Sequence, residues 1–152
     1  MSERSLIGHL LLAAGLVDEE QLDAALIEQE QSQVRLGEIL VRQGVVSELD
    51  LTQVLSNQLS VAWVSLSHVD FSRELLSLVP AELAAELTLI PVHFRRGEDR
   101  EKILYVAMDD PTDVAAMQKV SRATGMHVRP LIAPPSEIRR EITRQYSAVE
   151  EE

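Results

Sequence analysis

The sequence has 152 residues, enough for one ordinary domain or two small ones, and 45% of them are hydrophobic, so it can bury a core. Only 3% are aromatic, so that core is expected to be aliphatic. Acidic residues outnumber basic residues by 25 to 14, and the net charge of −11 argues against a general nucleic-acid binder.

The sequence contains no cysteine, which excludes a disulfide framework and a thiolate metal site. Its longest apolar run, Leu10 to Leu16, is too short to cross a bilayer. That run also lacks the basic flank and the small-residue cleavage site of a signal peptide. We therefore expect a soluble, reduced, cytoplasmic protein that does not insert directly into a membrane.

Four short helices, arranged as two hairpins, are predicted in the first 60 residues. Gly15 follows an apolar periodic stretch, where a left-handed residue would end a helix. Asp18 is a good N-cap, and Gln21 completes a capping box. Gly44 and Ser47 repeat this arrangement. The predicted helices cover residues 5–14, 18–32, 36–43 and 47–59.

The pattern changes after Ser60. The segment from Val61 to Leu66, which contains the only tryptophan, Trp63, is predicted to be extended. Two short helices are predicted near residues 72–78 and 80–87. Two strand-like segments follow, joined by a charged loop, and these predict a β-hairpin. The two strands are Leu89 to Arg95 and Ile103 to Met108.

Asp110, Pro111 and Thr112 are predicted to cap a helix of about 112–124, which Gly125 ends. A third strand is predicted from Met126 to Ala133, and a last helix from Pro134 to about Ser147. The strand–helix–strand unit implies a right-handed parallel crossover.

The expected fold class is α+β. An N-terminal four-helix half, made of two repeated helical hairpins, is packed with a small C-terminal α/β half with about three strands. The predicted subdomains are 1–60 and 61–148, followed by a frayed acidic tail at 149–152.

Signatures of an enzyme are largely absent. No glycine begins a Walker A loop, and no Gly-x-Ser-x-Gly elbow is present. The four histidines have no i,i+4 pair, so no metal site is expected. Asp109, Asp110 and Asp113 are most simply a turn and a cap. The arginines near the end of the last helix are most simply a solvated face, with an acidic partner surface as the sharper alternative: Arg139, Arg140 and Arg144.

The most informative feature is an internal repeat. Shifting the sequence by 29 residues pairs 24 positions from Leu6 onward, and eight pairs are identical. Average composition predicts roughly one or two such identities. The identical pairs are Gly8/Gly37, Leu11/Leu40, Gly15/Gly44, Val17/Val46, Glu19/Glu48, Leu22/Leu51, Leu26/Leu55 and Gln29/Gln58.

Several residues of the repeat are poorly explained by folding alone. Gln29 and Gln58 lie on the same helical stripe as the leucines, where an amide needs a hydrogen-bond partner. Gly8 and Gly37 lie near helix starts, where glycine costs helix propensity but leaves backbone N–H groups open to an anion. Arg35 adds a planar guanidinium group, whose N–H donors suit a phosphate or the edge of a purine. These features describe a pseudo-symmetric ligand with phosphates and flat rings.

The repeat resembles the tandem motif of the MshEN family, the N-terminal domains of type II secretion and type IV pilus assembly ATPases. Its pattern is Arg-Leu-Gly-x-x-Leu-x-x-x-Gly-x-x-x-x-x-x-Leu-x-x-x-Leu-x-x-Gln. Copy two, from Arg35, matches all eight motif positions. Copy one matches six identically, with Ile7 for Leu and Leu6 where Arg is expected. Downstream segments are also similar to the family: Leu78-Val-Pro-Ala-Glu-Leu-Ala, Ile90-Pro-Val, Val106-Ala-Met-Asp-Asp-Pro-Thr-Asp and Tyr146.

The resemblance implies a module that binds cyclic di-GMP, needs no cofactor or metal, and has a protein partner in secretion or pilus machinery. The ATPase motor that follows this domain in the family is missing, so ATP hydrolysis is not expected. The resemblance assigns ligand contacts to Leu6, Ile7, Gly8, Leu11, Leu22, Leu26, Gln29, Arg35, Leu36, Gly37, Leu40, Leu51, Leu55 and Gln58. Leu6 removes one of two arginines, and Arg4 is a candidate substitute.

Two other hypotheses remain open. The first is a ligand-free adapter of the same fold, in which Leu6 has abolished binding. It is favoured by the first 60 residues, which carry ten acidic and three basic side chains. The second is a helix-turn-helix DNA-binding domain, which the same lack of positive charge opposes.

Overall fold

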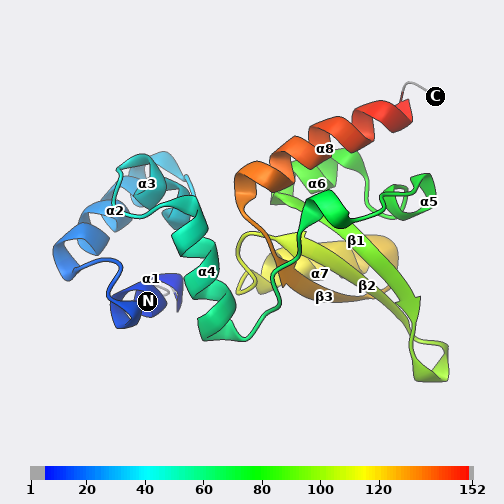
Figure 1. The fold of residues 1–152 in the computed structure, drawn as a ribbon, viewed down its shortest axis with the longest axis horizontal. Helices are drawn as coiled ribbons and strands as arrows, with labels where there is room; N and C mark the ends of the chain where they lie inside the picture. The colour runs from blue at the N-terminus through cyan, green and yellow to red at the C-terminus, as the bar shows by residue number, and fades with distance from the viewer. Residues whose placement is uncertain (1–5, 151–152) are drawn as a thin grey trace. The chain divides into compact units, whose positions relative to one another are not determined.

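The structure is a computed structural model that describes residues 6–150 (Figure 1). The chain divides into two compact units, Met1–Ser60 and Val61–Glu152. The first contains helices only among its described residues, and the second contains a three-stranded sheet with helices. The α+β class expected from the sequence is confirmed.

The helical unit contains the four predicted helices, each within about a residue of its expected bounds. Their bounds are α1 Leu6–Ala14, α2 Glu19–Ser32, α3 Leu36–Arg42 and α4 Glu48–Leu59. Ser5, where the first helix was predicted to begin, lies outside the described residues. Only residues 33–35 separate α2 from α3, because α2 continues to Ser32.

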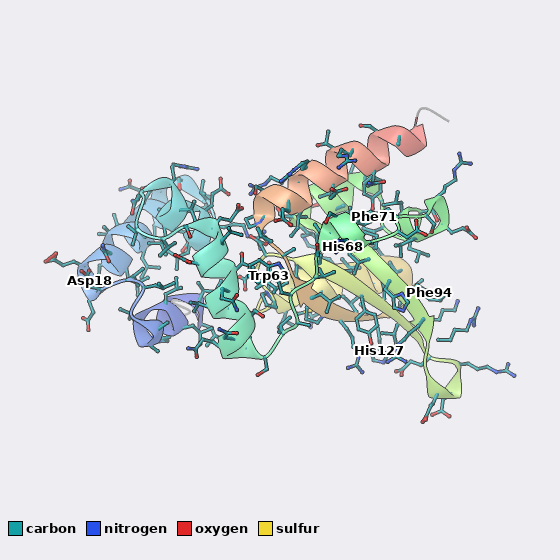
Figure 2. The ribbon with its side chains drawn as sticks, in the orientation of Figure 1. Asp18, Trp63, His68, Phe71, Phe94 and His127 are labelled. Atoms are coloured by element: carbon teal, nitrogen blue, oxygen red, sulfur yellow. The ribbon has the colours of Figure 1, made fainter. Side chains whose placement is uncertain are left out.

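Local side-chain chemistry explains where these helices begin. The backbone N–H of Asp18 donates to Oε1 of Gln21 at 2.9 Å, and the N–H of Gln21 donates to Oδ1 of Asp18 at 2.8 Å. This is the predicted capping box, which satisfies two helix-end donors at once. In copy two, Oγ of Ser47 accepts from the N–H of Asp50 at 3.0 Å. Asp18 is labelled in Figure 2.

Glycine ends the first helix of each copy in the same way. Gly15 and Gly44 both have φ of +76°, a left-handed conformation that costs glycine little. After Gly15, the N–H of Leu16 donates to the carbonyl of Leu11 at 3.1 Å. After Gly44, the N–H of Val45 donates to the carbonyl of Leu40 at 3.0 Å. These are matching Schellman-type ends, so the repeat extends to backbone geometry.

The second unit is built on a sheet in the order β1-β2-β3. β1 (Leu89–Arg96) and β2 (Lys102–Met108) are antiparallel, and β3 (His127–Ile132) is parallel to β2. Helix α7 (Val114–Thr124) connects the parallel pair. The predicted hairpin and crossover are therefore present. The remaining elements are the 3-10 helices η1 (Leu66–His68) and η2 (Glu98–Arg100), and α5 (Arg73–Leu76), α6 (Ala81–Leu87) and α8 (Pro135–Glu150).

The segment around Trp63 extends the sheet beside the end of β3, as its extended character predicts (Figure 2). The N–H of Val64 donates to the carbonyl of Ile132 at 3.0 Å. The N–H of Ile132 donates to the carbonyl of Ala62 at 2.9 Å. These two bonds fix the entry of the chain into the second unit.

The core of this unit is aliphatic and lies between the sheet and its helices. Its fully buried members include Leu89, Ile90, Leu104, Val106 and Met108. Helix α8 is fixed to this core by the hydroxyl of Tyr146, which donates to the carbonyl of Val79 at 2.9 Å. Burial raises the pKa of Tyr146 above its ordinary value.

Three helices of this unit differ from the sequence predictions by about two residues or more, and its other elements by about one residue. Helix α7 begins at Val114 rather than near 112, because Asp113 is its N-cap and accepts from the N–H of Ala116 at 3.0 Å. Helix α5 is shorter than predicted. Helix α8 continues to Glu150, beyond the predicted end near Ser147, so the first residues assigned to a frayed tail are helical. Glu151 and Glu152 lie outside the described residues.

Candidate ligand site

The strongest helix pairs in the helical unit join the two copies of the motif. Helix α1 packs with α4, and α2 packs with α3. Helices α1 and α2 come from copy one, whereas α3 and α4 come from copy two. The first helix of each copy is therefore beside the second helix of the other. A ligand bound at the beginning of α1 or of α3 would therefore also lie beside a helix of the other copy.

The aliphatic motif residues form most of the core of this unit. Leu26 is half-buried, and the buried members are Ile7, Leu11, Leu22, Leu36, Leu40, Leu51 and Leu55. Burying such a side chain stabilises a fold by about 1.5–3 kcal/mol. Folding alone therefore accounts for these seven residues. The less buried motif positions are the ones that folding alone does not explain.

Gly37 has a packing reason that its sequence position does not reveal. A Cβ at residue 37 would lie 2.9 Å from Cδ2 of Leu51, closer than real Cβ contacts occur. Close packing against Leu51 therefore explains this glycine. The hypothesis drawn from the sequence, that glycine leaves the backbone N–H groups open to an anion, is not needed. Its counterpart Gly8 is buried.

The two motif glutamines differ in exposure. Gln29 is half-buried near the end of α2, whereas Gln58 is exposed near the end of α4. Within residues 6–150, neither side chain has a hydrogen bond. The position of Gln58 on the leucine stripe therefore does not bury its amide, unlike Leu51 and Leu55 of the same helix. Both amides are available to a ligand.

Arg35 and Leu6 occupy equivalent places in the two copies. Arg35 is the N-cap residue of α3, and its side chain is half-buried and makes no cap hydrogen bond. Leu6 is the first residue of α1 and is 52% exposed, which is unusual for leucine. The arginine of copy two is thus replaced in copy one by an apolar side chain in solvent. Arg4, the candidate substitute, lies outside the described residues.

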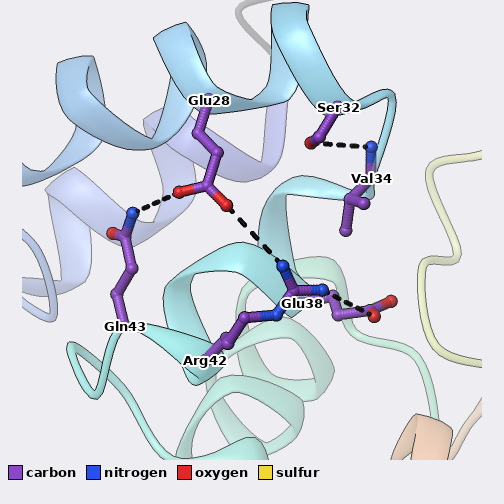
Figure 3. Close-up of polar contacts among 6 residues, drawn as sticks. All are labelled: Glu28, Ser32, Val34, Glu38, Arg42 and Gln43. Atoms are coloured by element: carbon purple, nitrogen blue, oxygen red, sulfur yellow. Dashed lines mark hydrogen bonds and ion pairs between the residues drawn. The ribbon is translucent and has the colours of Figure 1, made fainter.

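A polar cluster that the sequence analysis did not identify holds α2 to α3 (Figure 3). Nε2 of Gln43 donates to Oε1 of Glu28 at 2.8 Å. Arg42 lies between two carboxylates, with Nη1 3.7 Å from Oε2 of Glu28 and Nη2 3.3 Å from Oε2 of Glu38. The i,i+4 spacing of Glu38 and Arg42 was the only signal in the sequence. Arg42 therefore bridges α2 and α3 through carboxylates.

Other residues singled out in the sequence have structural roles. The carboxylate of Asp110 accepts from the N–H and hydroxyl of Thr112, which forms the turn before α7. Arg144 pairs with Glu141 at 3.4 Å. Within residues 6–150, no three acidic or histidine side chains are grouped to hold a metal ion. In that same range, no helix is long and apolar enough to span a membrane.

Comparison with known proteins gives a family-model match to the second unit and individual relatives that match nearly the whole chain. The family model of the MshEN domain matches residues 59–152. The chain is 33% identical over 141 residues to the type IV pilus assembly ATPase PilB of Myxococcus xanthus, covering 93% of the chain and 24% of that protein. It is 31% identical over 126 residues to bacteriophage adsorption protein B of Escherichia coli K12, covering 83% of the chain and 16% of that protein. The chain thus spans a quarter or less of these relatives.

Two solved structures share the fold over nearly the entire chain. One is MshE with cdg, at a TM-score of 0.70 and 30% identity, covering 91% of this chain and 96% of that one. The other is the N-terminal domain of XpsE, at a TM-score of 0.72 and 25% identity, covering 95% of this chain and 98% of that one. From its family-model match and its relatives, this chain belongs to the MshEN domain family.

Proposed function

We propose that this chain is a non-enzymatic regulatory module that binds cyclic di-GMP through the two copies of the motif. The observation that carries the proposal is the match of copy two at all eight motif positions, together with six of eight in copy one. The structure of MshE with cdg, an abbreviation of cyclic di-GMP, supports the choice of ligand. That neighbour is 30% identical and covers 91% of the chain.

The packing of the helices suits a ligand with two similar halves. One half would meet Arg35 and Gly37 at the start of α3, beside Leu26 and Gln29 of α2. The other would meet Leu6 and Gly8 at the start of α1, beside Gln58 of α4. The buried leucines give each half of the site a rigid apolar surface, so less conformational entropy is lost on binding.

The two halves differ in how they hold an anion. Arg35 can give a phosphate two parallel, charge-assisted hydrogen bonds, whereas Leu6 can give none. A lost charge-assisted bond corresponds to about 1.5–3 kcal/mol, or roughly ten- to hundred-fold in affinity. The half of the nucleotide beside Arg35 is therefore held more firmly, whereas the half beside Leu6 is held mainly by apolar contact and the amide of Gln58.

Ligand binding would be read out as a change in the packing of the hairpins. The pairs α1–α4 and α2–α3 both join the copies, so a ligand across the copies stabilises one arrangement of all four helices. A cytoplasmic partner in type II secretion or type IV pilus machinery would receive this change. The relatives named type IV pilus assembly ATPases support that association.

The competing function is a ligand-free adapter of the same fold. The replacement of arginine by Leu6, and the excess of ten acidic over three basic residues in the first 60, favour it. Long-range repulsion of an anionic nucleotide slows its association. The adapter would use the motif for core packing only, a role that the buried leucines already fill.

Thermal unfolding with and without nucleotide separates the two functions. A ligand that binds only the folded state at about 100 times its Kd stabilises it by about 2.7 kcal/mol. We expect cyclic di-GMP to raise the melting temperature in a saturable manner, while GMP and ATP have no effect. An unchanged melting temperature at all concentrations of cyclic di-GMP would favour the adapter.

A further inference from the structure

One end of the β-sheet presents cationic and aromatic side chains in register. His93 of β1 pairs with Tyr105 of β2, and Tyr105 pairs with Arg129 of β3. Two residues further along the strands, Arg95, Ile103 and His127 pair in the same manner. Directly paired residues project from the same face of a sheet, and so do residues two apart on one strand, so these two rows share a face.

Most side chains of these two rows are open to solvent. His93, Arg95, His127 and Arg129 are all exposed and Tyr105 is half-buried, whereas Ile103 is buried. Parallel strand pairs such as β2 and β3 are ordinarily covered on both faces. His127, at the beginning of β3, is labelled in Figure 2. We call His93, Arg95, Tyr105 and Arg129 the Tyr105 face.

The side chains of the Tyr105 face are held in place by one another. Nε of Arg95 donates to the hydroxyl of Tyr105 at 3.1 Å, and its Cζ lies 5.7 Å from the centre of the tyrosine ring. The ring of His93 lies 5.8 Å from that of Tyr105. Because Nε of Arg95 is occupied, its two terminal nitrogens remain as a fork that suits one carboxylate.

The arginines of this face have no acidic partner among residues 6–150. This is notable in a chain with 25 acidic and 14 basic residues. Some basic side chains elsewhere do pair with acids: Arg42 with Glu28 and Glu38, Lys119 with Glu86, and Arg144 with Glu141. Arg95 and Arg129 are thus left to solvent on rigid strands.

We propose that the Tyr105 face docks an acidic segment of a partner protein, whose carboxylates pair with Arg95 and Arg129. The charge of the face is complementary to such a segment and opposite to the net charge of the chain. A short acidic segment would contact only the Tyr105 face. It would not extend over the acidic side chains elsewhere on the surface of the chain. The residues of the Tyr105 face belong to the α/β unit, whereas the residues proposed to bind the dinucleotide all belong to the helical unit.

The same observations disfavour other polyanions. A nucleic acid would be expected to stack a base on the tyrosine, but the ring of Tyr105 already has Arg95 over it and His93 beside it. An anionic membrane or a nucleic acid presents charge over a wide area, and the net charge of −11 opposes it. A peptide with spaced carboxylates meets neither obstacle.

The test uses the full chain and a short fluorescent peptide of alternating Glu and Ser at low ionic strength. Fluorescence anisotropy measures affinity, and NMR chemical shifts of the backbone amides locate binding. The variant Arg95→Gln with Arg129→Gln is compared with Arg122→Gln plus Arg140→Gln. Both pairs change exposed arginines and the net charge equally. Thermal melts of both confirm that they fold.

We expect shifts centred on His93, Arg95, Tyr105 and Arg129, and a loss of at least about ten-fold in affinity in the first variant only. Tyr105→Phe, which removes the hydrogen bond that positions Arg95 but keeps both arginines, should weaken binding less. Equal losses in the two double variants would show non-specific charge attraction and overturn the proposal. Absence of peptide binding, or tighter binding of oligo-dT or phosphatidylglycerol vesicles than of the peptide, would overturn it too.

Discussion

Gly37 and Leu51 lie so close together that a methyl group on Gly37 would come within 2.9 Å of Cδ2 of Leu51. The contact joins the beginning of α3 to the beginning of α4, the two helices of copy two. Leu51 is buried in the core of the helical unit. Gly37 therefore allows close packing within one hairpin, at a motif position assigned to the ligand from sequence.

Gly37→Ala tests this packing role. The substitution removes the helix cost of glycine, about 0.5–1 kcal/mol, but forces Leu51 to move, at about 1–3 kcal/mol. We expect a net loss of stability of about 1 kcal/mol in urea denaturation. In a Leu51→Ala background, which itself costs about 2–5 kcal/mol, the added methyl has room and Gly37→Ala should stabilise. Equal effects in both backgrounds would show that the contact does not constrain residue 37.

Much of the fold could be predicted because its signals are local. The capping box of Asp18 and Gln21 and the left-handed Gly15 and Gly44 each depend on a few neighbouring residues, and all four appear as expected. Ambiguity arose where two residues offered the same chemistry. Asp110 and Asp113 are both good caps, and only the structure shows that Asp110 forms the turn and Asp113 caps α7.

The candidate site was harder to predict because it depends on packing between distant segments. The repeat identified which residues recur, but not that α1 packs with α4 and α2 with α3. Nor does helical periodicity reveal that Gln58 is exposed while Gln29 is half-buried. The crowding of Gly37 by Leu51 likewise belongs to tertiary structure.

Copy one has Leu6 at the motif position where copy two has Arg35, and this difference predicts opposite effects of two substitutions. Arg35→Ala should weaken cyclic di-GMP binding by at least about ten-fold, and Leu6→Arg should strengthen it, because a charged fork is removed or restored. Arg42→Ala is the matched control, since Arg42 is an exposed arginine of the same helical unit that lies outside the motif positions, and its loss changes the net charge equally. Calorimetric titration measures all three. If Arg35→Ala and Arg42→Ala reduce affinity equally, net charge rather than a specific contact is responsible.

Gln58 provides a test in which binding and stability separate. Its side chain is exposed, so Gln58→Leu should change the free energy of unfolding by no more than about 0.5 kcal/mol. Dinucleotide binding should nevertheless be lost if the amide contacts the ligand. Gln31→Leu, at another exposed glutamine outside the motif, is the control. A Gln58→Leu protein that keeps the full ligand-induced shift in melting temperature would remove Gln58 from the site.

The packing of helices across the copies predicts which residues act together on the ligand. Arg35 and Gln29 lie in the paired helices α3 and α2, whereas Gln58 lies in the other pair. In double-mutant cycles of binding, Arg35→Ala and Gln29→Ala should couple by about 0.5–3 kcal/mol. Arg35→Ala and Gln58→Ala should be additive within about 0.5 kcal/mol. The reverse pattern would mean that each half of the ligand is held by a single copy.

Cyclic di-GMP binding by the two motif copies is tested most directly by calorimetric titration of the chain, with GMP and ATP as controls. We expect saturable binding of cyclic di-GMP alone, weakened by Arg35→Ala and unaffected by Arg42→Ala. Absence of cyclic di-GMP binding, in a protein that melts cooperatively, would show that the motif has a packing role only.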